Sequence, residues 1–229
     1  MYYGYGLSYI QYILPGLIIA FIAQAKISSA YAKNKKISSG TGLTGAEAAK
    51  VIMDRNNLGD VTIRTVQGEL TDHYNPQDKT LNLSREVYYG DSIASLSIAA
   101  HEVGHALQHQ TGYAPLKIRA MLVPAANLGS NLSMFFIMLG LFFSTFFVKV
   151  GIAMFSLAVL FQIVTLPVEF NASRRAELEL SNGIMPSEKI IGTREVLSAA
   201  ALTYVASTLM SIGQLLRLLA LFGNRRDRD

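Results

Sequence analysis

The sequence contains no cysteine, which excludes a disulfide framework, a thiol nucleophile and any thiolate-ligated zinc or iron–sulfur site. A metal site in this chain must therefore use histidine, aspartate or glutamate. Charged residues are also scarce, at 16% of the 229 residues, whereas 51% are hydrophobic and gather in long runs. This composition excludes a disordered chain and favours a membrane protein with one ordinary domain.

The excess of basic over acidic residues, a formal net charge of +4, is weak evidence for nucleic-acid binding. Membrane proteins often have a basic composition because their cytoplasmic loops are rich in lysine and arginine. We therefore expect the lipid bilayer as a partner, and no nucleic acid.

An uncharged stretch at residues 7–25 is just long enough to cross a bilayer as a helix. A signal peptide is the alternative, but no lysine or arginine precedes the stretch. The positive charges all follow it, at Lys26, Lys33, Lys35 and Lys36. Residues 1–25 are therefore predicted to hold an uncleaved transmembrane helix whose C-terminal end faces the cytoplasm.

Residues 26–118 have the composition of a soluble domain, which we expect to be small, cytoplasmic and α+β. Thr44 and Glu47 have the spacing of a capping box and predict the start of a helix. Ser92 predicts the N-cap of a second helix. The expected elements are helices at residues 44–56 and 93–110 and strands at residues 61–66, 70–74 and 80–83, the last two forming a hairpin.

The second half of the chain is again apolar, with candidate spans at about residues 121–148, 150–167 and 196–222. Little more than Lys149 separates the first two, which predicts a transmembrane hairpin within residues 119–168. Residues 169–195 are polar and carry four lysines or arginines, so they are expected on the cytoplasmic side. Residues 196–229 end in a basic tail (Arg225, Arg226 and Arg228) that argues against export. The last segment is therefore either a span or an interfacial or re-entrant helix.

The predicted helix at residues 93–110 contains the H-E-x-x-H pattern, as His101-Glu102-Val103-Gly104-His105. Residues four apart project from one helix face, so both imidazoles can reach one zinc ion. Glu102 can accept a proton from a zinc-activated water as that water attacks a carbonyl carbon, and pass it to the leaving amine. The pattern therefore indicates peptide hydrolysis. The alternative is that two surface or core histidines have this spacing by chance. This alternative is weaker, because the chain has only four histidines.

A catalytic zinc site needs a third protein ligand and an open position for water. The extended pattern with a third histidine fails, because Thr111 stands at that position and Gln108 stands where a glycine is expected. His109 lies one turn too far along the helix, which favours an exposed or capping role. Glu169 follows the predicted hairpin, and two spans separate it from His105, so both face the same side of the membrane. Glu169 is the expected third ligand; a carboxylate that marks a helix end is the alternative.

These motifs resemble those of known membrane proteases. The chain resembles the gluzincin proteases related to HtpX and the CAAX prenyl endoproteases. Two segments carry this resemblance, His101-Glu102-x-x-His105 and Glu169-Phe170-Asn171-Ala172-Ser173-Arg174-Arg175-Ala176. The resemblance to bacterial YugP-type membrane zinc metallopeptidases is closer, covers most of the chain and includes Thr71-Asp72-His73-Tyr74 and Ala99-Ala100-His101. The resemblance implies one Zn²⁺ per chain, a third ligand from the glutamate motif, a cytoplasm-facing active site and a peptide substrate.

One position departs from the HtpX-like pattern. In those relatives an aspartate four residues after the glutamate supports a ligand histidine. Here that position is Ser173. The supporting role is therefore expected to fall to Ser173, Asn171 or water.

Metalloproteases commonly bind substrate as an added strand along an exposed sheet edge. The strand at residues 80–83, just before the metal helix, is the candidate edge, and an ordinary hairpin packed on that helix is the alternative. His73 or Tyr74 could donate a hydrogen bond to the tetrahedral oxyanion. Either residue could instead be a polar residue that flanks the turn.

The sequence thus predicts an α-helical integral membrane protein with a small α+β zincin-like cytoplasmic domain that carries the H-E-x-x-H helix. Its expected function is that of a multi-pass zinc endopeptidase of the plasma membrane, acting on protein or peptide substrates in membrane-protein quality control. The alternative is a non-hydrolytic membrane protein with a structural or sensory zinc site. Glu102 argues against that alternative, because a structural site needs no acid between its histidines. A zinc transporter is disfavoured, since the predicted spans carry almost no ionisable residues.

Overall fold

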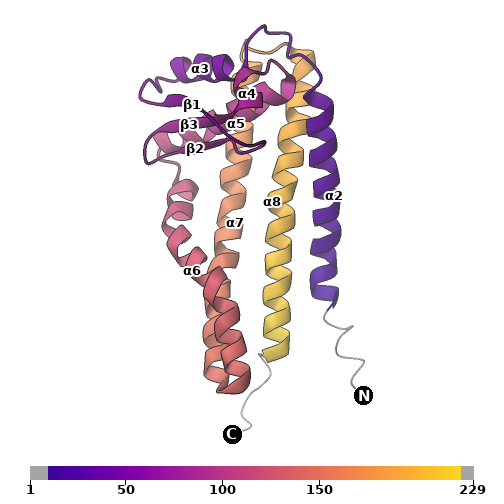
Figure 1. The fold of residues 1–229 in the computed structure, drawn as a ribbon, viewed down its shortest axis with the longest axis vertical. Coiled ribbons are helices and arrows are strands. Elements are labelled where there is room, and N and C mark those ends of the chain that lie inside the picture. Colours follow the sequence, from indigo (N-terminus) through magenta and orange to yellow (C-terminus); the bar gives the residue numbers. More distant parts are fainter. Residues whose placement is uncertain (1–9, 223–229) are drawn as a thin grey trace. The chain divides into compact units, whose positions relative to one another are not determined.

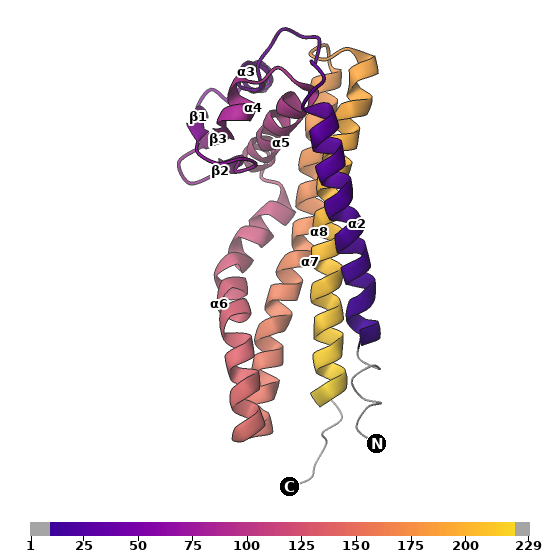
Figure 2. The ribbon, with the colours of Figure 1, turned by 45° about the vertical axis from the view of Figure 1, so that its right-hand side comes forward.

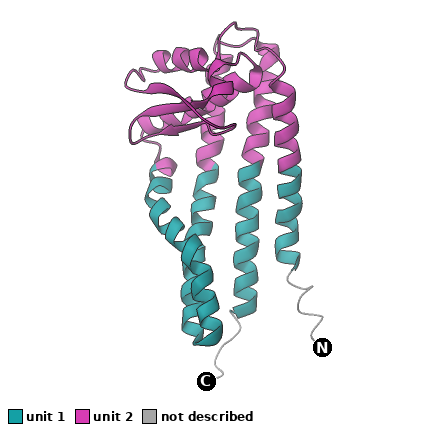
Figure 3. Ribbon diagram, viewed as in Figure 1, with its two compact units in different colours: residues 1–23, 117–166, 203–229 teal, residues 24–116, 167–202 magenta. Residues whose placement is uncertain are grey.

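A computed structural model of the chain describes residues 10–222 (Figure 1). Most of these residues are helical, and the strands form one small sheet. The chain divides into two compact units built from alternating segments (Figure 3). Unit 1 comprises residues 1–23, 117–166 and 203–229, and unit 2 comprises residues 24–116 and 167–202. The basic tail and the first residues of the predicted N-terminal span lie outside the described residues.

Within residues 10–222, four helices are long and apolar enough to cross a membrane. They are α2 (Ile10–Asn34), α6 (Ala114–Phe142), α7 (Thr145–Ser181) and α8 (Ser187–Phe222). A span of about 20 apolar residues is sufficient to cross the hydrocarbon core. The prediction of a helical protein with several possible membrane spans is therefore confirmed, and α8 is among the helices of sufficient length.

The structure corrects one predicted boundary in the second half. The break between α6 and α7 lies at residues 143–144, so Lys149 lies inside α7. Ser144 accounts for the position of this break, because its hydroxyl accepts a hydrogen bond from the Phe146 N–H, as an N-cap serine does. Residues 169–195 are formed by the end of α7, which continues through Pro167, and by the beginning of α8 at Ser187. Pro167 removes only one backbone donor from the helix.

Within unit 1, α6 and α7 approach closely at glycine. A Cβ atom at Gly129 would collide with the backbone of Met154. Gly151, on α7, lies equally close to α6, where a Cβ would sit 2.7 Å from the Ser133 carbonyl oxygen. Small residues at such points allow two apolar helices to pack backbone to backbone, which is the common packing mode of helices in a bilayer.

Unit 2 contains the small α+β part of the chain (Figure 2). Its helices are α3 (Gly45–Arg55), α4 (Arg85–Tyr89) and α5 (Ile93–Gln110), and its strands are β1 (Thr62–Val66), β2 (His73–Asn75) and β3 (Thr80–Ser84). Thr44 and Glu47 form the predicted capping box, and the Ser92 hydroxyl caps α5. The core between these elements contains the buried apolar residues Ile52, Met53, Leu81, Leu83, Leu96 and Val103.

The sheet has the strand order β1-β3-β2. β2 pairs antiparallel with β3, as the predicted hairpin requires, and β1 pairs parallel with the other side of β3. The expectation that residues 80–83 form an exposed edge is therefore wrong, because β3 is the central strand. Leu81 and Leu83 are completely buried there. The edges of the sheet are β1 and β2.

Candidate metal centre

Three potential ligands from two helices meet in unit 2. His101 and His105 lie one turn apart on α5, and Glu169 lies on α7. Their ligand atoms lie within 4.8 Å of one another. The Oε2 atom of Glu169 is 3.3 Å from Nε2 of His101 and 3.7 Å from Nε2 of His105. Glu169 is only 3% exposed, so its carboxylate is directed into the protein beside the two imidazoles.

The spacing of these atoms fits a zinc ion. Zinc bonds of about 2.0–2.1 Å in a tetrahedron separate two ligand atoms by about 3.3–3.4 Å. The two nitrogen–oxygen separations of 3.3 and 3.7 Å agree with this edge within a few tenths of an ångström. Two imidazoles and one carboxylate are also the ligands of a common type of catalytic zinc site, which keeps a fourth position open.

Gly104 explains how the two ligand-bearing helices come so close. A Cβ atom at this position would lie 2.6 Å from the carbonyl oxygen of Ala172 on α7. Ala172 and Val168 are completely buried on the same face of α7. The small residue inside the H-E-x-x-H pattern therefore lets the backbone of α7 reach α5, and this contact places Glu169 opposite the histidines.

Each imidazole has a polar neighbour at the nitrogen that faces away from Glu169. Nδ1 of His101 lies 3.2 Å from the Ser173 hydroxyl, and Nδ1 of His105 lies 3.0 Å from Oε1 of Gln108. Asn171 contacts Gln108. Partners of this kind orient metal-binding histidines. Sequence reasoning proposed Ser173 and Asn171 but missed Gln108, whose signal was its position three residues after His105 on the same helix.

Charge affects His105 in two opposing ways. Burial disfavours a charged imidazole, but the neighbouring carboxylates of Glu169 and Glu102 outweigh burial and raise the pKa of His105 above its ordinary value. A proton therefore competes with a metal ion for this side chain, as expected for a histidine in an acidic cluster.

The Glu102 carboxylate is held by the edge strand of the sheet. It is 9% exposed, and its Oε2 atom accepts a hydrogen bond of 3.0 Å from the backbone N–H of Tyr74 on β2. Because the Tyr74 N–H donates to Glu102, it is directed away from β3 and towards α5, as at a non-hydrogen-bonded position of an antiparallel pair. The outer edge of β2 and the H-E-x-x-H helix thus face each other.

The other sequence-predicted candidates lie around this centre and not in the ligand cluster. The Tyr74 hydroxyl is 2.8 Å from Nδ1 of His109, and the His73 ring is 2.8 Å from the Thr71 carbonyl oxygen. It is therefore the backbone of Tyr74, and not its side chain, that contacts Glu102. Among the described residues, His109 is outside the group of His101, His105 and Glu169.

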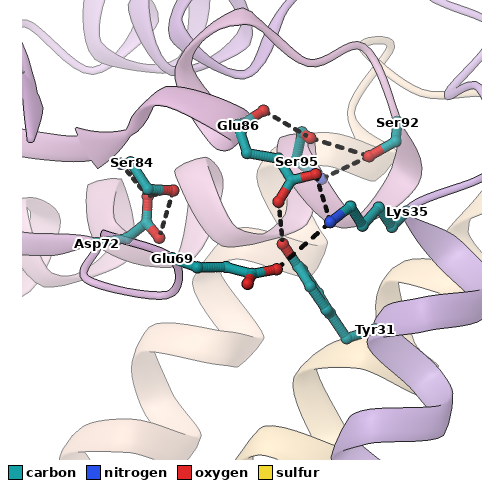
Figure 4. Close-up of polar contacts among 8 residues, drawn as sticks. All are labelled: Tyr31, Lys35, Glu69, Asp72, Ser84, Glu86, Ser92 and Ser95. Atoms are coloured by element: carbon teal, nitrogen blue, oxygen red, sulfur yellow. Dashed lines mark hydrogen bonds and ion pairs between the residues drawn. The ribbon is translucent and has the colours of Figure 1, made fainter. Parts of the chain in front are cut away.

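The segment before β2 is anchored at Asp72 (Figure 4). The Asp72 carboxylate accepts hydrogen bonds from the backbone N–H and the hydroxyl of Ser84, at 2.7 and 3.1 Å. Burial raises the pKa of Asp72 above its ordinary value, although these hydrogen bonds favour the charged form. Asp72 directly precedes β2, so the contact fixes where the strand begins.

A second anchor joins the same segment to the end of α2 (Figure 4). Lys35 forms ion pairs with Glu69 at 3.3 Å and Glu86 at 2.6 Å, and the Tyr31 hydroxyl donates to Glu86 at 3.0 Å. The hydrogen bond from Lys35 is the main reason that the pKa of Glu86 is lowered. The chain that leads into β2 is thus held from two sides.

Comparison with known proteins agrees with this geometry. The model of the family described as "putative neutral zinc metallopeptidase" matches residues 9–223. The "putative membrane protease YugP" of Bacillus subtilis (strain 168) is 44% identical over 218 residues, which cover 94% of this chain and 97% of that protein. No solved structure matches significantly. The family match includes all three residues of the ligand cluster, and the chain belongs to this zinc metallopeptidase family.

Proposed function

We propose that this chain is an integral-membrane zinc endopeptidase that hydrolyses peptide bonds in protein substrates. The observation that carries the proposal is the cluster of His101, His105 and Glu169 with the Glu102 carboxylate beside it. Four helices able to span a membrane and the family membership support the same function. Within the proposal, unit 2 is a zincin-like domain, and the expected substrates are unfolded or damaged membrane proteins.

In the proposed mechanism, zinc held by the three ligands would act as a Lewis acid and lower the pKa of water. Glu102 is the general base, which accepts a proton from the attacking water and returns it to the leaving nitrogen. We assign proton transfer to its Oε1 atom, because Oε2 accepts the Tyr74 N–H. That hydrogen bond also holds the carboxylate in one orientation.

The substrate is proposed to add as a strand along the outer edge of β2. This edge takes the place of residues 80–83, which are paired on both sides. A peptide along β2 would run past Glu102, because the N–H of Tyr74 on that edge already reaches its carboxylate. The peptide would therefore exchange with Glu102 for this N–H or pair with the other main-chain groups of the edge, and such recognition would give broad sequence specificity.

Proteolysis by the purified full-length chain tests the proposed function directly. The protein in detergent should cleave casein or an unfolded membrane protein, lose this activity with a zinc chelator and regain it when zinc is restored. Fragments are measured by gel electrophoresis and mass spectrometry. A preparation that holds one zinc per chain, remains folded and cleaves neither substrate would contradict the proposal and favour a structural or sensory zinc site.

We further infer that unit 2 faces the cytoplasm of a cell with this chain in its plasma membrane. The inference rests on the positive-inside rule, because basic residues are concentrated in residues 26–119 and 169–195. The chain has no native cysteine, so single cysteines can be placed at exposed positions. In intact cells, Ser38→Cys and Ser187→Cys should resist an impermeant thiol reagent, whereas Ser144→Cys in the α6–α7 turn should react. All three should react after permeabilisation; labelling of either of the first two in intact cells would reverse the orientation.

A further inference from the structure

The Gln108 side chain connects the two helices that carry the metal ligands. It is completely buried, and its Oε1 atom lies 3.0 Å from Nδ1 of His105 on its own helix. Its Nε2 atom donates to the Val168 carbonyl oxygen at 2.7 Å and to Oδ1 of Asn171 at 3.1 Å, both on α7. A buried amide with every polar atom engaged has one favourable orientation.

The orientation of this amide follows from groups that can only donate or only accept. Arg175 can only donate, and its Nε atom lies 2.9 Å from the Asn171 side-chain oxygen, which identifies that atom as an acceptor. The Val168 carbonyl is also an acceptor. The NH₂ group of Gln108 must therefore face Asn171 and Val168, and its oxygen must face His105.

This orientation determines where His105 carries its proton. The Gln108 oxygen can only accept, so Nδ1 of His105 must be the protonated nitrogen. In a neutral imidazole the lone pair then belongs to Nε2, the atom that lies 3.7 Å from the Glu169 carboxylate. A zinc ligand needs that lone pair on the side of the other two ligands.

The second histidine lacks a comparable constraint. Nδ1 of His101 lies 3.2 Å from the Ser173 hydroxyl, which can either donate or accept. Ser173 can therefore support His101 without selecting its tautomer. The two histidines therefore differ, because Gln108 selects the tautomer of His105 and Ser173 does not select that of His101.

We propose that Gln108, oriented through Asn171 by Arg175, is a positioning residue that holds His105 in the Nδ1-protonated tautomer and so presents Nε2 to zinc. The role rests on the proposed zinc site. It adds to the centre a chain of hydrogen bonds that runs from the ligand His105 through the side chains of Gln108 and Asn171 to Arg175, which is on α7 like Glu169.

Replacement of Gln108 by methionine tests this role, because methionine has a similar size and no hydrogen-bonding amide. The variant should bind zinc about 10- to 100-fold more weakly than the wild type, the usual cost of losing a partner of a ligand histidine. In zinc-free protein in alkaline buffer, nitrogen NMR of labelled histidines should show Nδ1-protonated His105 in the wild type and a shift towards the other tautomer in Gln108→Met. The matched control is Gln110→Met, on the same helix and exposed, which should change neither measurement.

The two readouts separate this inference from the proposed function. If the wild type binds no zinc, the proposed function fails, and the tautomer of zinc-free His105 still decides the role of Gln108. Unchanged zinc affinity and an unchanged tautomer in folded Gln108→Met would overturn the role. If that variant does not fold, Gln108→Leu replaces it, because leucine also fills the site and lacks both amide groups that face His105 and Val168. A shift towards the other tautomer in folded Gln108→Leu supports the role, and the wild-type tautomer overturns it.

Discussion

Replacement of Glu102 by glutamine is expected to abolish peptide hydrolysis while zinc remains bound. Glutamine keeps the shape of the side chain, and its oxygen can still accept the hydrogen bond from the Tyr74 N–H. It cannot accept the proton that must leave the attacking water. General acid–base assistance is worth typically about 100- to 10,000-fold in rate, and one group that serves both proton transfers can cost more.

Zinc content, thermal stability and cleavage of the same substrate should be measured on one preparation of Glu102→Gln. Glu177→Gln is a suitable control, because Glu177 lies on α7, pairs with Arg194 and is absent from the ligand cluster. The control should cleave at the wild-type rate. Cleavage at that rate by the Glu102 variant would refute the proposed mechanism. The structural-zinc alternative predicts no functional change in folded Glu102→Gln.

Local sequence signals predicted most helices of unit 2 because the interactions that define their ends are local. The capping box at Thr44 and the N-cap at Ser92 both form as expected. Ser144 carries the same kind of signal before α7 but lies within a long apolar run, in which the charge of Lys149 is the more visible sign of a turn. A lysine near the end of an apolar helix can extend its ammonium group to the interface, so it does not require a break.

The arrangement of the sheet could not be predicted in the same way. The hairpin of β2 and β3 is local, and its turn is visible in the sequence. The position of β1 depends on a parallel pairing across a longer connection, which places it beside β3 and not beside β2. That pairing buries β3 between two strands and leaves β2, with Tyr74, as the edge that faces Glu102.

The residues of the ligand cluster could be predicted where their positions depend only on the spacing within one helix or on the number of predicted spans between them. His101 and His105 follow from helical spacing, and Glu169 follows because two spans return the chain to the same side. Gln108 was not predictable, since its partners Val168 and Asn171 depend on the close packing of α7 against α5 at Gly104. In the sequence alone, Gln108 is visible as a departure from the extended histidine pattern and as a residue three positions after His105, and neither feature identifies its partners on α7.

Replacement of Glu169 by alanine is expected to remove most zinc binding. The change deletes one of three ligands, the one whose oxygen lies within 3.7 Å of both imidazole nitrogens. Loss of a partner of a ligand histidine costs about 10- to 100-fold in metal affinity, so loss of a ligand itself should cost more than about 100-fold. Zinc stabilises the folded state by mass action, and the wild type should therefore show a higher melting temperature with zinc, whereas Glu169→Ala should not.

The matched control for this ligand is His109→Ala. His109 is on α5 two turns after Glu102 but pairs with Tyr74 and lies outside the ligand cluster, so its replacement should leave zinc affinity unchanged. Metal analysis and competition with a chelator report occupancy and affinity, and circular dichroism shows whether both variants keep their helices. Full zinc affinity in folded Glu169→Ala would remove this carboxylate from the site. Loss of zinc from His109→Ala in that case would identify His109 as the third ligand and require α5 to deviate from a regular helix after His105, because a straight helix carries His109 too far from the ion.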